Sequence, residues 1–195
     1  HSFDNSNLNA RQMFSHLKHT KDKPVMPLPY RCEGAAPKNI NAFTDGSWIH
    51  PLKQYLGIGG AGIWWPNRSF TKDKAPCYWG PISTNEDQIA QFRQEHNGLI
   101  LFTCIGGYTG SSTRTELAAG LIAIMAHGPV HIGSDSQAFV DKATYYLGLI
   151  GEGRVPKRHW KLVSDGDLWE HFFLAAQAKG AHAIRLTWVK GNATQ

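Results

Sequence analysis

The alternation of apolar and polar positions along the chain predicts five strands, at residues 40–44, 57–65, 99–108, 130–134 and 184–188. Apolar residues at helical spacing predict helices within residues 84–95, 115–127 and 137–147. A further helix is expected to begin at Asp167, with Glu170 as its capping-box partner, and a short one is expected within residues 5–23. Apart from the helices at 5–23 and 84–95, the elements follow one another as β-β-β-α-β-α-α-β.

This order predicts an α/β fold with a five-stranded mixed sheet flanked by helices. Three leading strands joined by short turns are expected to be antiparallel, whereas the later strands, which are joined through helices, are expected to be parallel. The four tryptophans that lie on strand or helix patterns are expected in the core: Trp64, Trp65, Trp169 and Trp188.

Prolines divide the chain into segments. Four of them between residues 24 and 37 interrupt regular structure, so residues 1–38 are interpreted as a partly irregular N-terminal extension. Residues 39–195 form the predicted domain. Within it, residues 66–97 contain three further prolines and are interpreted as an insertion between the second and third strands.

Composition narrows the functional classes. No apolar run is long enough to cross a membrane, and the polar N-terminus has no secretory signal. The three cysteines are widely spaced and odd in number, which argues against a disulfide framework or a zinc site and favours a reducing compartment, the cytoplasm or nucleus. The chain has 20 Lys and Arg against 15 Asp and Glu, a balance that favours an anionic partner such as nucleic acid.

Three acidic residues lie in informative contexts: Asp45 in FTDGS, Glu116 in TRTELAA and Asp135 in GSDSQ. Asp45 and Asp135 are expected to end two strands, and Glu116 is expected in the first turn of a helix. Because the carboxyl ends of parallel strands share one edge of a sheet, the three carboxylates are expected to meet and to hold divalent metal ions. Each residue alone also has an ordinary explanation, as a turn, a helix-dipole partner or an N-cap.

The chain resembles a type 1 ribonuclease H domain. The motifs FTDGS, GGAGIWW, YTGSSTRTELAAGLIAI, VHIGSDSQAFVDKA, HWKLVSDGDLWEHF and LTWVKGNAT occur in the order of that family, from residue 39 to the C-terminus with an interruption at 66–97. The resemblance implies a ribonuclease H-like fold that hydrolyses the RNA strand of RNA–DNA hybrids, leaving 5′-phosphate ends. It implies two Mg²⁺ ions, replaceable by Mn²⁺, on Asp45, Glu116 and Asp135. Asp45 is expected to be the bridging ligand, because its strand is expected to lie centrally in the sheet.

The resemblance also implies substrate contacts. Those near the metal ligands are expected from Gly46, Ser47, Ser112, Thr113, Arg114, Gln137 and Lys190. The basic stretch at residues 154–161 resembles the protrusion that grips the DNA strand, through Arg158, Trp160 and Lys161. Alternative explanations are helix capping for Ser112 and Thr113, and packing of Trp160 on the domain.

Two departures from the family pattern stand near the C-terminus. Asn192 occupies a catalytic position at which the family usually carries histidine, and asparagine cannot titrate near neutrality. The fourth family carboxylate and its helix are not found before Gln195. Asp165 and Asp167 are interpreted as helix caps rather than substitutes for it.

The leading functional hypothesis is therefore a hybrid-specific endonuclease. A sequence that begins at His1 is typical of a processed chain or a piece of a retroelement polyprotein, in which a reverse transcriptase would be the fused or associated partner. Two alternatives stay open: a catalytically silent module that binds nucleic acid or protein, and a DNA strand-transfer or resolvase-type enzyme on the same fold.

Overall fold

The structure is a computed structural model, and it describes residues 28–49, 58–68, 90–105 and 111–191. A six-stranded sheet has the order β3-β4-β2-β1-β5-β6. Its strands are β1 (Ala42–Ile49), β2 (Ile58–Trp65), β3 (Ala90–Glu95), β4 (Gly98–Ile105), β5 (Val130–Ser134) and β6 (Ile184–Trp188). The first four pair antiparallel, and β1, β5 and β6 pair parallel, as the element order predicts.

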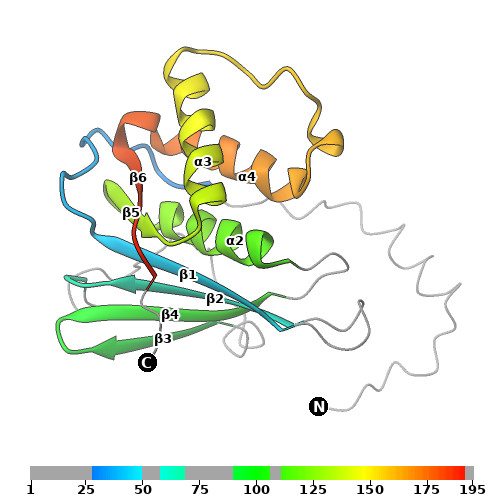
Figure 1. Cartoon of the computed structure of the whole chain (residues 1–195). Coiled ribbons are helices and arrows are strands. Elements are labelled where there is room, and N and C mark those ends of the chain that lie inside the picture. The colour runs from blue at the N-terminus through cyan, green and yellow to red at the C-terminus, as the bar shows by residue number, and fades with distance from the viewer. Residues whose placement is uncertain (1–27, 50–57, 69–89, 106–110, 192–195) are drawn as a thin grey trace, which may run out of the picture.

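Three α-helices lie over one face of the sheet (Figure 1). They are α2 (Ser112–Met125), α3 (Gln137–Gly151) and α4 (Gly166–Lys179), with short 3₁₀ helices η3 (Trp160–Leu162) and η4 (Ala181–Ala183) beside α4. The mixed α/β class is confirmed, and the sheet has one strand more than predicted. Among the described residues, no helix is long and apolar enough to span a membrane.

The additional strand corrects the prediction of a helix over residues 84–95. Residues 90–95 form β3, which pairs antiparallel with β4 through a tight connection at residues 96–97, where His96 has a positive φ of 50°. The sequence AQFRQE contains good helix formers, but pairing with a neighbouring strand overrides this weak local preference. The rest of that predicted helix, and the one expected within residues 5–23, lie outside the described residues.

Two predicted boundaries are also wrong. Asp45 does not end the first strand: β1 continues to Ile49, because it pairs with β2 from Phe43 to Ile49. The helix expected to begin at Asp167 begins at Gly166, and the N-cap residue Asp165 makes no capping hydrogen bond through its side chain. Asp167 instead lies inside the first turn, where its carboxylate accepts hydrogen bonds from Arg114.

The described part of the N-terminal extension, residues 28–38, is hydrogen-bonded to the sheet and helices. The Cys32 and Ala36 amides donate to the carbonyls of Lys179 and His182, each at 2.9 Å. The Pro37 carbonyl lies 3.1 Å from Nδ1 of the buried His131 on β5. This segment is thereby attached both to the end of α4 and to β5.

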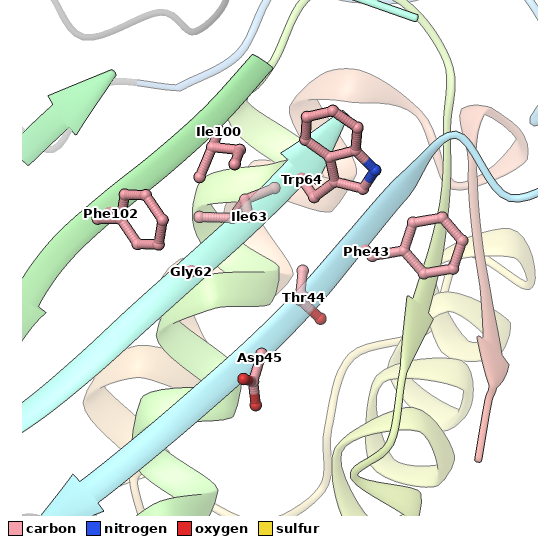
Figure 2. Close-up of a pocket in the computed structure, with 8 residues that line it drawn as sticks. All are labelled: Phe43, Thr44, Asp45, Gly62, Ile63, Trp64, Ile100 and Phe102. Carbon is pink, nitrogen blue, oxygen red and sulfur yellow. The ribbon is translucent and has the colours of Figure 1, made fainter. Parts of the chain in front are cut away.

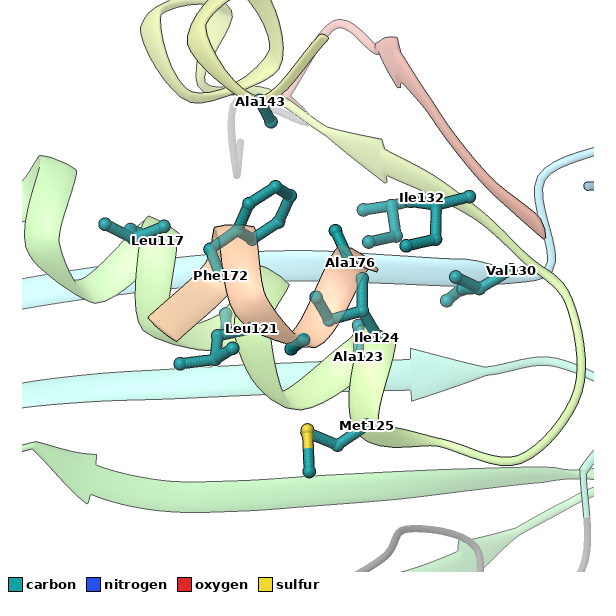
Figure 3. Close-up of a cluster of buried hydrophobic side chains, with 14 of the residues drawn as sticks. Leu117, Leu121, Ala123, Ile124, Met125, Val130, Ile132, Ala143, Phe172 and Ala176 are labelled. Carbon is teal, nitrogen blue, oxygen red and sulfur yellow. The ribbon is translucent and has the colours of Figure 1, made fainter. Parts of the chain in front are cut away.

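The hydrophobic core lies between the sheet and the helices, with α2 at its centre (Figure 3). Ten of the 14 residues of α2 are buried, because the helix packs on β1 and β2 on one side and on α4 on another. Trp65 and Trp169 belong to this core and Trp64 is half-buried. Trp188 does not belong to it, since it is 46% exposed.

Gly120 in the middle of α2 gives the core one of its tightest contacts. A Cβ atom at this position would lie 2.1 Å from Cζ of the fully buried Phe139 ring on α3. The absence of a side chain therefore lets the Phe139 ring lie directly against the helix backbone.

Gly120→Ala is expected to destabilise the protein by about 1–3 kcal/mol, because the methyl group overpacks a closed core. This reverses the usual gain of up to about 1 kcal/mol for Gly→Ala inside a helix. The measurement is urea unfolding. Gly148→Ala on α3, where a Cβ meets nothing within 4 Å, is the matched control. A Gly120→Ala variant as stable as the control would contradict this packing.

Candidate metal centre

Three carboxylates from three different elements meet beside the end of β5. Asp45 lies in the middle of β1, Glu116 in the second turn of α2, and Asp135 directly after β5. The parallel register pairs Thr44 with Ser134, which places the following residues, Asp45 and Asp135, side by side. One carboxylate oxygen from each residue lies within 4.8 Å of the other two. This separation allows a single cation to contact all three side chains.

Gly46 brings β1 and α2 close enough for this arrangement. A Cβ atom on Gly46 would lie 2.5 Å from the backbone nitrogen of Glu116 and 2.7 Å from the carbonyl carbon of Thr115, so only glycine fits. Pairing of β1 with β5 stops at Thr44, and the Gly46 N–H donates instead to Oε1 of Glu116 at 2.6 Å. The glycine after Asp45 thus orients the neighbouring Glu116 carboxylate and does not form the turn typical of Asp-Gly.

Ser134, which sequence reasoning missed, connects Glu116 to the turn that carries Asp135. Its hydroxyl lies 3.4 Å from Oε2 of Glu116 and accepts a hydrogen bond from the Ser136 amide at 3.2 Å. The side chain is completely buried. A small hydroxyl residue at the last position of a buried strand was the available signal.

The electrostatics of the cluster favour a bound cation. The pKa of Glu116 is raised from 4.5 to about 7, chiefly by burial, and the Gly46 hydrogen bond offsets only part of that effect. The negative charges of Asp135 and Asp45 contribute to the same rise. All of the candidate ligand atoms are carboxylate oxygens, which Mg²⁺ and Mn²⁺ prefer. The residues present therefore fit a hard divalent ion.

The other candidate residues near the cluster are mostly exposed. Ser112 and Thr113 are exposed at the start of α2, where Ser111 rather than either of them is the N-cap. Ser47 is exposed two residues after Asp45, on the same face of β1. Gln137 opens α3 and donates to Asp141 at 2.7 Å.

Arg114 is held in an ion pair with the start of α4. Its guanidinium contacts Asp167 at 2.7 and 2.9 Å and Asp165 at 3.3 Å. The hydrogen bonds to Asp167 raise the pKa of Arg114 and lower that of Asp167. Arg114 precedes Glu116 by two residues, so these ion pairs tie the end of α2 that carries Glu116 to the start of α4.

The basic stretch divides into exposed cations and a packed aromatic ring. Arg158 and Lys161 are exposed. The Trp160 ring lies 5.3 Å from that of Tyr146 and 5.7 Å from that of Phe173, so it packs on the domain. Lys190 is exposed after β6, and Asn192 lies outside the described residues.

A cavity of about 240 Å³ opens beside Asp45 on the sheet face (Figure 2). Aromatic side chains of three strands line it: Phe43 on β1, Trp64 on β2 and Phe102 on β4. Phe43 and Phe102 are 38% and 50% exposed. Gly62 leaves the sheet surface uncovered between them. The strand alternation that places Phe43 and Asp45 on one face was a signal for this surface.

Comparisons with known proteins give structural likeness only. No family model and no curated protein matches the chain. LC9-RNase H1, a type 1 RNase H with the type 2 active-site motif, is 18% identical with a TM-score of 0.46, over 87% of this chain and 66% of that chain. A foamy viral protease-reverse transcriptase in complex with double-stranded DNA is 19% identical with a TM-score of 0.46, over 76% and 79%.

The prototype foamy virus protease-reverse transcriptase is 16% identical with a TM-score of 0.47, and the match covers 94% of this chain but 24% of that one. The present chain thus spans less than two thirds of LC9-RNase H1 and about a quarter of this viral protein. Five strands of the present sheet run in the order β4-β2-β1-β5-β6, with antiparallel pairs followed by parallel ones. This is the mixed arrangement that the element order predicts, and β3 adds an edge strand to it.

Glu116→Gln is expected to stabilise the metal-free protein at pH 8, by roughly 1–3 kcal/mol. Because the folded protein holds the Glu116 proton up to about pH 7 and the unfolded chain releases it near 4.5, ionisation of Glu116 lowers stability as the pH rises through this window. Glutamine removes the charge and keeps an acceptor for the Gly46 N–H.

The measurement is thermal unfolding in EDTA from pH 4 to pH 8. The gain should shrink below pH 7 and vanish near pH 4.5. Glu170→Gln, at an exposed position on α4, is the matched control and should change little. A gain for Glu116→Gln that does not depend on pH would contradict the expected repulsion.

Proposed function

We propose that this protein is a divalent-metal-dependent endonuclease that hydrolyses the RNA strand of RNA–DNA hybrids. The observation that supports the proposal most strongly is the meeting of Asp45, Glu116 and Asp135 within 4.8 Å on a ribonuclease H-like fold. The order of the sequence motifs from FTDGS to LTWVKGNAT supports the choice of substrate. A reverse transcriptase as fused or associated partner belongs to the same proposal.

In this mechanism Asp45, Glu116 and Asp135 would hold the two Mg²⁺ ions. When bound, the ions supply activation of the attacking water and neutralisation of charge on the scissile phosphate and the leaving 3′ oxygen. The chain orients its ligands through the Gly46 N–H and the Ser134 hydroxyl, so that Glu116 is already aimed at the cluster. Such preorganisation reduces the rearrangement that the reaction requires.

Recognition of the hybrid would use two groups of side chains, one polar and one cationic. Ser112, Thr113 and Gln137 are polar and would contact ribose 2′-hydroxyls, the groups that distinguish RNA from DNA. Arg158 and Lys161 are exposed cations that would bind phosphates of the DNA strand. Trp160 would support this stretch by packing on Tyr146 and Phe173 rather than by contacting the nucleic acid.

Cleavage of a labelled RNA–DNA hybrid tests the proposal directly. Mg²⁺ or Mn²⁺ should support cutting of the RNA strand alone, EDTA should abolish it, and RNA–RNA and DNA–DNA duplexes should remain intact. Asp45→Asn and Glu116→Gln should each reduce the rate by about 100-fold or more, as loss of a major electrostatic group does. Glu170→Gln is the control that should retain activity.

The outcomes separate the competing functions. A hybrid that is bound but not cut would favour the silent binding module. Cutting of double-stranded DNA would favour a strand-transfer or resolvase-type enzyme.

Arg158→Ala and Lys161→Ala are each expected to weaken hybrid binding and to reduce the slope of log affinity against log salt by about one. Each removes one phosphate contact and should not alter the choice between RNA and DNA. Fluorescence anisotropy in an Asp45→Asn background measures binding without cleavage. Arg93→Ala, at an exposed position on β3, is the matched control. An unchanged salt slope in both test variants would exclude the basic stretch from the interface.

A further inference from the structure

The chain that follows β6 passes directly against Asp135. The Trp188 indole N–H donates to the main-chain carbonyl of Asp135 at 2.9 Å, and the Val189 amide donates to the carbonyl of Ser134 at the same distance. Three residues after Trp188, the main chain of Gly191 lies beside the Asp135 side chain. The backbone of Asp135, a candidate metal ligand, is thus held by a hydrogen bond, and the main chain of Gly191 restricts the space on one side of its carboxylate.

Burial does not account for the position of Trp188. The side chain is 46% exposed, although Trp65 and Trp169 are almost completely buried. Its indole nitrogen nevertheless makes a well-formed hydrogen bond to the residue directly after β5. The contact therefore fixes the turn that presents Asp135, rather than adding to the core.

A positive φ does not explain why residue 191 is a glycine. The glycines with positive φ among the described residues are Gly128, Gly153 and Gly180, and Gly191 is not one of them. What excludes a side chain is the carboxylate: a Cβ atom at Gly191 would lie 2.6 Å from Oδ2 and 3.3 Å from Cβ of Asp135. The nearest atom is the end of a flexible side chain. A methyl group would therefore rotate the carboxylate and leave the fold intact.

We propose that Gly191 and Trp188 are positioning residues for the Asp135 carboxylate, acting on metal affinity without touching the metal. The inference rests on the proposed function only in requiring that the carboxylate cluster binds a divalent ion. Trp188 sets the main chain of Asp135, and Gly191 leaves room for the one carboxylate orientation that faces Asp45 and Glu116. Groups that orient a metal ligand in this way typically change metal affinity about 10- to 100-fold.

The test is the affinity of the full chain for Mn²⁺. It is measured by calorimetry and, independently, by the electron paramagnetic resonance signal of free Mn²⁺. Gly191→Ala and Trp188→Phe should each weaken binding about tenfold. Trp188→Phe keeps an aromatic ring but removes the N–H donor together with the second ring of the indole. Gly148→Ala, a glycine of α3 with open space around it, is the matched control and should bind like the wild type.

A second readout separates positioning from general damage to the fold. In EDTA, Gly191→Ala should unfold within about 2 °C of the wild type, because the rotation of one exposed carboxylate leaves the packed core unchanged. Wild-type affinity in the variants would overturn the inference, as would weakened binding that only follows a lower unfolding temperature in EDTA. If the wild type binds no Mn²⁺, both the proposed function and this inference fail. If the wild type binds Mn²⁺ and Gly191→Ala binds it equally well, only the inference fails.

Discussion

Direct contact between the backbone of β1 and the start of α2 is the constraint on which the rest of the site depends. Gly46 has no side chain, so the two backbones approach closely enough for its N–H to reach Glu116. Helix α2 in turn packs on β1, β2 and α4 and is buried along most of its length. A larger residue at position 46 would push the helix, and Glu116 with it, away from the strand that carries Asp45.

The site concentrates the negative charge of three carboxylates in one place. Glu116 is buried beside Asp45 and Asp135, and its carboxylate accepts hydrogen bonds from the Gly46 amide and the Ser134 hydroxyl. The nearby cation Arg114 is paired with Asp165 and Asp167 instead. The core under α2 therefore supports a local arrangement that is unfavourable until a cation binds, as is common at functional sites.

Sequence patterns predicted the parallel half of the sheet well, because short apolar strands between helices have few alternatives. The structure has strands at 130–134 and 184–188, as expected. The sequence patterns failed where a distant partner determines the structure. Residues 90–95 pair with β4, and Asp167 forms hydrogen bonds with Arg114 rather than capping its helix. The Asp45-Gly46 dipeptide signals a turn in isolation, and only the position of α2 shows why a glycine stands inside a strand. Metal binding, the catalytic position of Asn192 and the domain boundaries remain predictions.

The distribution of the three carboxylates along the chain has a thermodynamic consequence. Glu116 lies 70 residues from Gly46, and Asp135 comes from a third element, so no short fragment contains the cluster. The unfolded chain has no preformed place for the ion, and any cation that these carboxylates hold is a ligand of the native state alone. Its concentration then enters the folding equilibrium directly, adding about 2.7 kcal/mol when the free ion is at 100 times its dissociation constant. For this protein, the supply of divalent ions would set the population of folded molecules as well as their chemistry.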